Sequence, residues 1–108
     1  MNLKATNRHV VRYRTRPELG DENARLIQNV FLELAARSPA GLHYAVLRLS
    51  DDTFLHIVER EDGPNPLQAY ESFRAFSGTV KERCVEPPQF CDAVLVGNYR
   101  VIGEGHGT

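Results

Sequence analysis

The sequence predicts an α+β domain in which two helices cover one face of a four-stranded antiparallel sheet. Apolar residues recur at helical spacing in residues 22–37 and 67–84, which predicts the two helices. Other stretches are rich in β-branched and aromatic residues, which favour strands, and Pro or Gly separates them from the helices. The 108 residues suit one domain, expected to span residues 1–108, with its core at about residues 8–102 and a tail at 103–108.

The first strand and the first helix are expected near the N-terminus. The strand is predicted at residues 8–14, and Pro17 and Gly20 then interrupt the extended chain. Asp21 is the expected N-cap of the helix at residues 22–37, because its carboxylate can accept hydrogen bonds from the free amides of the first turn. Pro39 ends this helix, and Gly41 allows the chain to reverse.

A hairpin is predicted from residues 42–50 and 53–60, with its turn around Asp51 and Asp52. In the expected register, Leu49 lies opposite Phe54 and Leu47 opposite His56. One face then carries Leu47, Leu49, Phe54, His56 and Val58. The other face carries Tyr44, Val46, Arg48, Leu55, Ile57 and Glu59.

The second helix and the last strand complete the order βαββαβ. Asn65 is the expected N-cap and Pro66 the first residue of the helix, while Gly78 marks a kink or a break. The sequence "EPPQ" at residues 86–89 is expected to stop the helix, and the last strand is predicted at residues 90–102. With right-handed crossovers this order gives the ferredoxin-like split βαβ arrangement.

Both faces of the predicted sheet are apolar, although helices cover only one of them. An antiparallel sheet that faced water would be polar on its exposed side. The second face is therefore expected to pack against the same face of another copy, which makes the protein a homodimer.

Composition argues against several classes of protein. The net charge is −1 and the basic residues are scattered, so no nucleic-acid partner is expected. The sequence has neither a signal peptide nor an apolar run long enough for a membrane span, which predicts a cytoplasmic protein without a membrane partner. Cys84 and Cys91 are expected to be reduced, small and buried, because their spacing does not fit a zinc site.

Motifs for cofactors and for common hydrolases are missing from the sequence. It contains no GxGxxG, GxxxxGK or GxSxG, and its four histidines show no H-E-x-x-H spacing. No cofactor and no metal ion are therefore expected.

Three stretches resemble a known superfamily when they are taken with the element order and the doubly apolar sheet. They are "RLSDDTFLHIVE", "NPLQAYESFRAF" and "VGNYRVI", within a resemblance that covers roughly residues 10–101. They resemble the dimeric α+β barrel superfamily, in particular the small bacterial proteins grouped with antibiotic biosynthesis monooxygenases. The resemblance implies a dimeric barrel, a pocket between each sheet and its helices, and cofactor-independent oxidation. The better-known monooxygenases and haem degraders use a tryptophan in the site, and this sequence has none, so no catalytic residue is carried over.

His56 is the candidate catalytic residue, because its unperturbed pKa lies near neutral pH. As a base it would have to reach a substrate proton at hydrogen-bond distance. The alternative, which is the commoner state of such a residue, is a buried or interfacial imidazole bonded to a backbone carbonyl or a carboxylate.

The ligand-binding candidates are Tyr44, Arg48, Tyr70, Phe73 and Phe76. Arg48 either pairs with Glu59 or binds a carboxylate or phenolate of a ligand. The two phenylalanines either line a pocket or fill the core, and the two tyrosines offer hydroxyl groups.

Three functions remain open from the sequence. The first is cofactor-independent, monooxygenase-like oxidation of an aromatic or apolar metabolite. The second is a non-catalytic module that binds a small ligand, and the third is a structural dimer without a small-molecule site.

Overall fold

The computed structural model describes residues 6–61 and 63–101 and confirms the ferredoxin-like α+β fold. Its sheet has the antiparallel order β2-β3-β1-β4. The strands are β1 (Thr6–Thr15), β2 (Leu42–Arg48), β3 (Thr53–Glu61) and β4 (Cys84–Asp92). No helix in these residues is long and apolar enough to cross a membrane.

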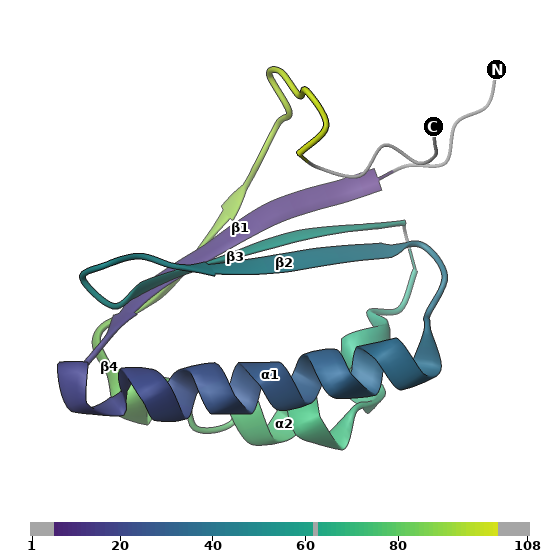
Figure 1. The fold of residues 1–108 in the computed structure, drawn as a ribbon. Coiled ribbons are helices and arrows are strands. Elements are labelled where there is room, and N and C mark those ends of the chain that lie inside the picture. Colours follow the sequence, from purple (N-terminus) through teal and green to yellow (C-terminus); the bar gives the residue numbers. More distant parts are fainter. Residues whose placement is uncertain (1–5, 62, 102–108) are drawn as a thin grey trace, which may run out of the picture.

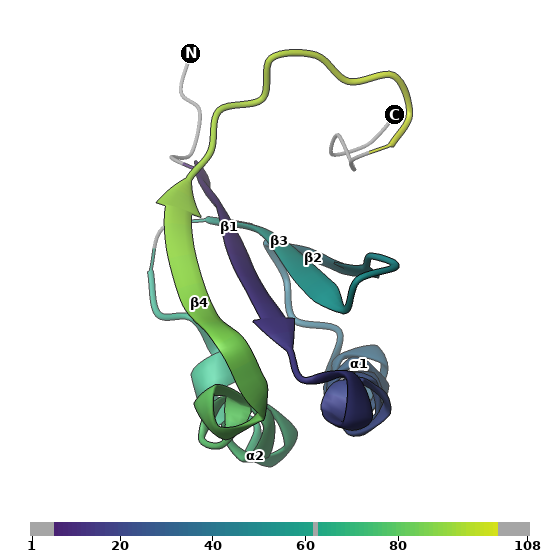
Figure 2. The same ribbon diagram turned by 90° about the vertical axis from the view of Figure 1, so that its left-hand side faces the viewer.

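Two helices lie on the same face of the sheet (Figures 1 and 2). They are α1 (Gly20–Arg37) and α2 (Glu71–Ser77), with the short 3₁₀ turns η1 (Pro17–Leu19), η2 (Pro66–Ala69) and η3 (Val80–Arg83) beside them. The core between the two layers contains Tyr13, Ile27, Val30, Phe54, Leu67, Tyr70, Phe76 and Val80. The predicted two-layer arrangement therefore forms, with an aromatic core.

The first helix begins earlier than predicted, so the N-cap assigned to Asp21 is wrong. The turn η1 runs directly into α1, and Leu19 occupies the N-cap position without a side-chain hydrogen bond. Asp21 instead lies in the first turn, where its carboxylate accepts from Arg48 at 3.0 Å. The predicted end is confirmed, because α1 ends at Arg37 and Ser38 adopts a left-handed conformation with φ 43°.

The predicted register of the hairpin is wrong by one residue. Val46, rather than Leu47, lies opposite His56. The cause is the turn, in which the amide of Leu49 donates to the carbonyl of Thr53 at 2.8 Å. Only residues 50–52 then form the loop, and its last residue adopts a left-handed conformation with φ 66°. Three-residue hairpin loops commonly end in this way.

This shift moves every side chain of β2 to the opposite face of the sheet, since side chains alternate along a strand. The face toward the helices carries Tyr44, Val46, Arg48, Phe54, His56 and Val58. The outer face of the hairpin carries Ala45, Leu47, Leu55, Ile57 and Glu59. Apolar side chains therefore occupy both faces, as predicted, although their distribution differs from the prediction.

The second helical region is divided into three parts. The Asn65 side chain accepts from the amide of Leu67 at 3.0 Å, which confirms the predicted cap before Pro66. Residues 67–84 do not form one helix, because Tyr70 is extended between η2 and α2 and the chain breaks again at Gly78. The expected break at Gly78 is thus confirmed, and the helix is shorter than predicted.

The last strand lies earlier in the chain than predicted. β4 contains Pro87 and Pro88, which were expected to precede it as part of a stop signal. β4 is an edge strand, and its pairing with β1 is irregular between Arg12 and Arg14, where an extra residue can be accommodated. Prolines are tolerated at edges and bulges because no ladder hydrogen bond is lost there.

The segment after β4 projects away from the helices (Figures 1 and 2). Residues 93–101 contain neither a strand nor a helix. Position 102, where the last strand was expected to end, and the tail at 103–108 lie outside the described residues. Cys91 in β4 is exposed and Cys84 half-buried, so the prediction of two buried cysteines is wrong.

Candidate functional site

A pocket of about 470 Å³ lies between the sheet and the region of α2, and we call it the His56 pocket. Its sheet side is formed by His9, Val11, Tyr13, Tyr44, His56, Val58, Pro88 and Phe90. Its other side is formed by Asn65, Leu67, Gln68, Phe73, Phe76, Ser77, Val80 and Lys81. The walls are mainly aromatic and aliphatic, with a few polar groups among them, which is the usual character of a small-molecule site.

Two tyrosine hydroxyls hold the imidazole of His56. The hydroxyl of Tyr13 lies 2.8 Å from Nε2, and the hydroxyl of Tyr44 lies 2.8 Å from Nδ1. His56 is 4% exposed, and this burial lowers its pKa to about 4, so the ring is neutral at neutral pH. The partners are therefore phenols, rather than the backbone carbonyl or carboxylate that the sequence suggested for a buried His56.

The hydrogen bonds continue from Tyr13 into the core. Asn23 donates from Nδ2 to the hydroxyl of Tyr13 at 2.9 Å, and Arg83 donates from Nε to Oδ1 of Asn23 at 2.8 Å. Asn23 and Arg83 are 0% and 6% exposed. We call this series, from Arg83 through Asn23, Tyr13 and His56 to Tyr44, the polar chain.

Arg83 is buried, and no carboxylate among the described residues lies within ion-pair distance of its guanidinium. Its remaining side-chain hydrogen bonds go to Oγ1 of Thr79 at 2.6 Å and to the carbonyl of Phe76 at 3.1 Å. Its guanidinium also lies 5.5 Å from the ring centre of Phe76. Burial lowers the pKa of Arg83, but an arginine this well hydrogen-bonded remains charged.

Burial has the opposite effect on the two tyrosines. It raises the pKa of Tyr13 and that of Tyr44 well above the ordinary value, because the charged phenolate is poorly solvated there. Both residues therefore keep their protons, and the polar chain consists of neutral groups beyond Arg83.

The strand pairing explains why these groups meet. Tyr13 and Tyr44 belong to the two strands on either side of β3, and each is displaced by two positions from the residue opposite His56. Such diagonal neighbours on one face are within reach of long aromatic side chains. Asn23 comes from the buried stripe of α1, four residues before Ile27.

Aromatic packing fixes the rings of the site. Phe76 stacks on His56 with a centroid distance of 5.4 Å, and Phe31 stacks on Tyr44 at 4.9 Å. Tyr13 stacks on Phe54 at 5.5 Å. Each hydrogen-bonding ring is thus held by a neighbour, which preorganises the hydroxyl and imidazole groups.

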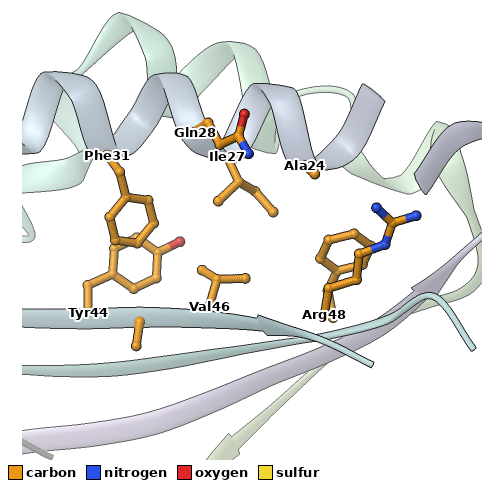
Figure 3. A pocket seen from close by; sticks show the side chains of 9 residues that line it. Ala24, Ile27, Gln28, Phe31, Tyr44, Val46 and Arg48 are labelled. Carbon is orange, nitrogen blue, oxygen red and sulfur yellow. The ribbon is translucent and has the colours of Figure 1, made fainter. Parts of the chain in front are cut away.

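A second cavity, of about 440 Å³, lies between α1 and β2 (Figure 3), and we call it the α1–β2 groove. Phe31 and Tyr44 close one end and Arg48 lies at the other, with Ile27 and Val46 between them (Figure 3). Tyr44 lines both this groove and the His56 pocket.

Arg48 does not pair with Glu59, and that prediction is wrong. Its guanidinium bonds Asp52 at 2.7 Å and Asp21 at 3.0 Å. Glu59 points to the outer face and pairs with Arg8 at 2.6 Å. The one-residue difference in register separates the two residues that were expected to meet.

The predicted site residues fall into two groups. Tyr44, His56, Phe73 and Phe76 meet in the His56 pocket. Arg48 lies in the α1–β2 groove, and Tyr70 is a core residue that is 4% exposed, with Arg37 over its ring at 5.1 Å. The described residues contain no group of three His, Cys, Asp or Glu side chains that could hold a metal ion.

Three members of the polar chain were not predicted from the sequence. Asn23 does carry a signal, since it is a polar residue on the apolar stripe of a helix. Tyr13 carries no such signal, because aromatic residues are common in strands. Arg83 lies in η3, after the break at Gly78. The sequence pattern predicts the break but not the position of Arg83 in the core.

No family model matches the chain, and no curated protein matches it. Solved structures do share its fold. A candidate antibiotic biosynthesis monooxygenase from Nitrosomonas europaea is 10% identical, with a TM-score of 0.69, over 89% of this chain and 95% of that protein. A second candidate of the same name from Caulobacter crescentus is 14% identical, with a TM-score of 0.64, over 85% and 92% of the two chains.

A third structure is described as a dimeric ferredoxin-like protein of unknown function, from Jannaschia. It is 10% identical, with a TM-score of 0.63, over 84% of this chain and all 100% of that one. At these identities the likeness concerns the fold alone. The chain therefore has the ferredoxin-like fold found among antibiotic biosynthesis monooxygenase-like proteins, as the resemblance in its sequence predicts.

Proposed function

We propose that the His56 pocket binds a small aromatic or apolar metabolite and that the chain oxidises it without a cofactor, as a monooxygenase-like enzyme. The observation that carries this proposal is the pocket itself, whose lining combines aromatic walls with a hydrogen-bonded tyrosine and histidine. Its volume of about 470 Å³ suits a ligand of a few fused rings. Two proteins with a similar fold are described as candidate antibiotic biosynthesis monooxygenases, which supports an oxidation.

In this chemistry the deprotonated substrate reduces dioxygen itself: one oxygen atom enters the substrate as a new carbonyl group, and the other leaves as water with the two hydrogens lost from the oxidised carbon. The protein then has to exclude water and to stabilise the substrate anion. Phe73 and Phe76 would form the dry walls, and Tyr44 would contact the substrate oxygen.

His56 has a supporting place in this proposal. Both of its ring nitrogens are bonded to tyrosines, so it acts on a ligand through Tyr44 as a positioning residue. Arg48 and Tyr70 have no role in the proposed ligand site. The guanidinium of Arg48 is engaged in ion pairs, and Tyr70 is packed in the core.

One observation favours the alternative of a non-catalytic binding protein. A histidine with a pKa of about 4 is a weak base at neutral pH, and a weak base assists deprotonation poorly. Oxygen uptake separates the two functions, since only the enzyme consumes oxygen when the ligand is added.

Ligand binding is tested by thermal shift against phenols, naphthoquinols, haem and small lactones. A ligand at 100 times its dissociation constant stabilises the folded state by about 2.7 kcal/mol. We expect a hit that weakens in Tyr44→Phe and persists in Tyr99→Phe, whose hydroxyl lies on a side chain that is 79% exposed. If no compound shifts the wild-type protein, the third possibility, a structural dimer without a ligand, gains support.

We also propose that the protein is a homodimer through the outer face of the sheet, and that it is cytoplasmic. The outer face carries the apolar residues Val10, Ala45, Leu47, Leu55 and Ile57, and Leu47 is 51% exposed. One of the similar structures is described as dimeric.

Light scattering tests the dimer at micromolar concentration. We expect a dimeric wild type, a monomeric Leu47→Lys and a dimeric Leu32→Lys, because Leu32 is 70% exposed on α1, away from that face. A monomeric wild type would rule out the proposed interface.

A further inference from the structure

The polar chain has a fixed direction, which begins at Arg83. A guanidinium has only donors, so the atom of Asn23 that faces it must be the carbonyl oxygen. The amide nitrogen of Asn23 then faces Tyr13 and donates to its hydroxyl oxygen. The charge on Arg83 thus determines the orientation of the Asn23 side chain.

The next link is settled by the burial of Tyr13. Its oxygen accepts from Asn23. Among the described residues, the one acceptor within reach of its hydroxyl hydrogen is Nε2 of His56, at 2.8 Å. The opposite arrangement, with Nε2 as the donor, would leave the hydroxyl hydrogen of Tyr13 without an acceptor. Tyr13 is 1% exposed, and an unpaired polar hydrogen is costly at such a position.

The direction then passes through the imidazole to Tyr44. A neutral histidine whose Nε2 accepts carries its hydrogen on Nδ1, and this nitrogen lies 2.8 Å from the Tyr44 hydroxyl. Tyr44 therefore accepts from His56, and its own hydroxyl hydrogen is left over. No residue among 6–61 and 63–101 accepts that hydrogen, and Tyr44 lines both the His56 pocket and the α1–β2 groove, of which the His56 pocket also contains the imidazole that orients the hydroxyl.

We infer that Tyr44 is a fixed hydrogen-bond donor to whatever fills the His56 pocket, and that the pocket therefore selects aromatic ligands with an acceptor oxygen. A phenolate or a quinone carbonyl provides such an oxygen. A neutral phenol fits less well, because its own O–H needs an acceptor and Tyr44 faces it as a donor. This inference rests on the proposed function, since it assumes that the pocket is occupied by a small molecule.

Two effects make the donor strong. A hydrogen bond to an anion is roughly twice as strong as one between neutral groups. Each hydroxyl or amide that accepts a bond also becomes a better donor, so the charge on Arg83 polarises the chain toward Tyr44.

Asn23→Asp tests the direction because it should reverse every link from residue 23 to Tyr44, while Arg83 remains a donor to residue 23. A carboxylate at this position can only accept, so Tyr13 would donate to it, and His56 would then donate from Nε2 to Tyr13. The nitrogen NMR shifts of His56 report which ring nitrogen carries the hydrogen. We expect Nδ1–H in the ligand-free wild type and Nε2–H in Asn23→Asp. An Nε2–H wild type, or the same tautomer in both proteins, would overturn the inference.

Asn23→Asp also keeps Arg83 satisfied, since the new carboxylate accepts from the same guanidinium. Tyr44→Phe provides a second variant, which removes the terminal donor and leaves the three links between Arg83 and His56 in place. The tautomer of His56 should remain Nδ1–H in this variant.

Selection of the ligand is tested with 4-nitrophenol, whose phenolate absorbs visible light. We expect the bound probe to favour phenolate over phenol by about tenfold, which lowers its pKa by about one. This preference should vanish in Tyr44→Phe and turn toward the neutral phenol in Asn23→Asp. A bound probe whose pKa is raised in the wild type would overturn the inference and leave the proposed pocket standing. No binding at all would count against the proposed function, while the tautomer measurement still decides the direction of the chain.

Discussion

Tyr13→Phe removes one oxygen atom from the middle of the polar chain and changes little else. The ring still packs on Phe54, so the loss is one of hydrogen bonding. The amide of Asn23 and Nε2 of His56 both lose their partner, and these residues are 0% and 4% exposed. Each buried group left unpaired costs about 1–3 kcal/mol, so with two such groups the free energy of unfolding should fall by about 2–6 kcal/mol. This is a large part of the stability of a small domain.

Urea unfolding, followed by circular dichroism, measures this difference between wild type and variant. The control is Tyr99→Phe, because Tyr99 is 79% exposed and its change should stay within about 0.5 kcal/mol. If Tyr13→Phe lost no more stability than this control, the hydroxyl of Tyr13 would not hold the chain together. The assignment of donors from Arg83 to Tyr44 would then lose its central link.

Two further predictions concern the stability of the protein at low pH and the space around two glycines. The pKa of His56 falls from 6.5 to about 4 on folding, so the unfolded chain binds more protons between these values and stability drops by about 3 kcal/mol as the pH falls through them. Unfolding measured as a function of pH should show no such fall in stability in His56→Gln. The fall should remain in His43→Gln, which would assign it to His56. Gly20→Ala should change the melting temperature little, because an added Cβ would meet only the ends of the Arg48 and Asp52 side chains, which can move aside, and Gly97→Ala has open space and should also leave it unchanged. A clearly lower melting temperature for Gly20→Ala than for Gly97→Ala would show that the side chains of Arg48 and Asp52 cannot move aside.

The order of the elements could be predicted because its signals are local. Helical spacing marked α1, and the cap of Asn65 and the break at Gly78 appeared where the sequence placed them. The position of β4 could not be predicted in the same way. Whether a strand tolerates Pro87 and Pro88 depends on its lying at an edge, and this depends on the order of the strands in the finished sheet.

The site was predicted as separate residues and not as an arrangement. His56 and Tyr44 were both named, but the expected register placed them on opposite faces of the sheet. Their contact depends on a three-residue loop whose last residue is left-handed, and Asp52 gives only a weak signal for that conformation. Asn23 and Arg83 join the site through packing between α1 and the segment after α2, which no spacing in the sequence encodes.

Tyr44 lines two cavities, so one side chain limits the size of both. Its side chain lines both the His56 pocket and the α1–β2 groove, whose volumes are about 470 and 440 Å³. The volume of the Tyr44 side chain therefore limits the size of ligand that each cavity accepts, together with the other lining residues. A smaller residue there would enlarge both cavities, so that molecules larger than either cavity now accepts could bind. The same substitution would remove the hydroxyl, so a gain in capacity would come with a loss of discrimination.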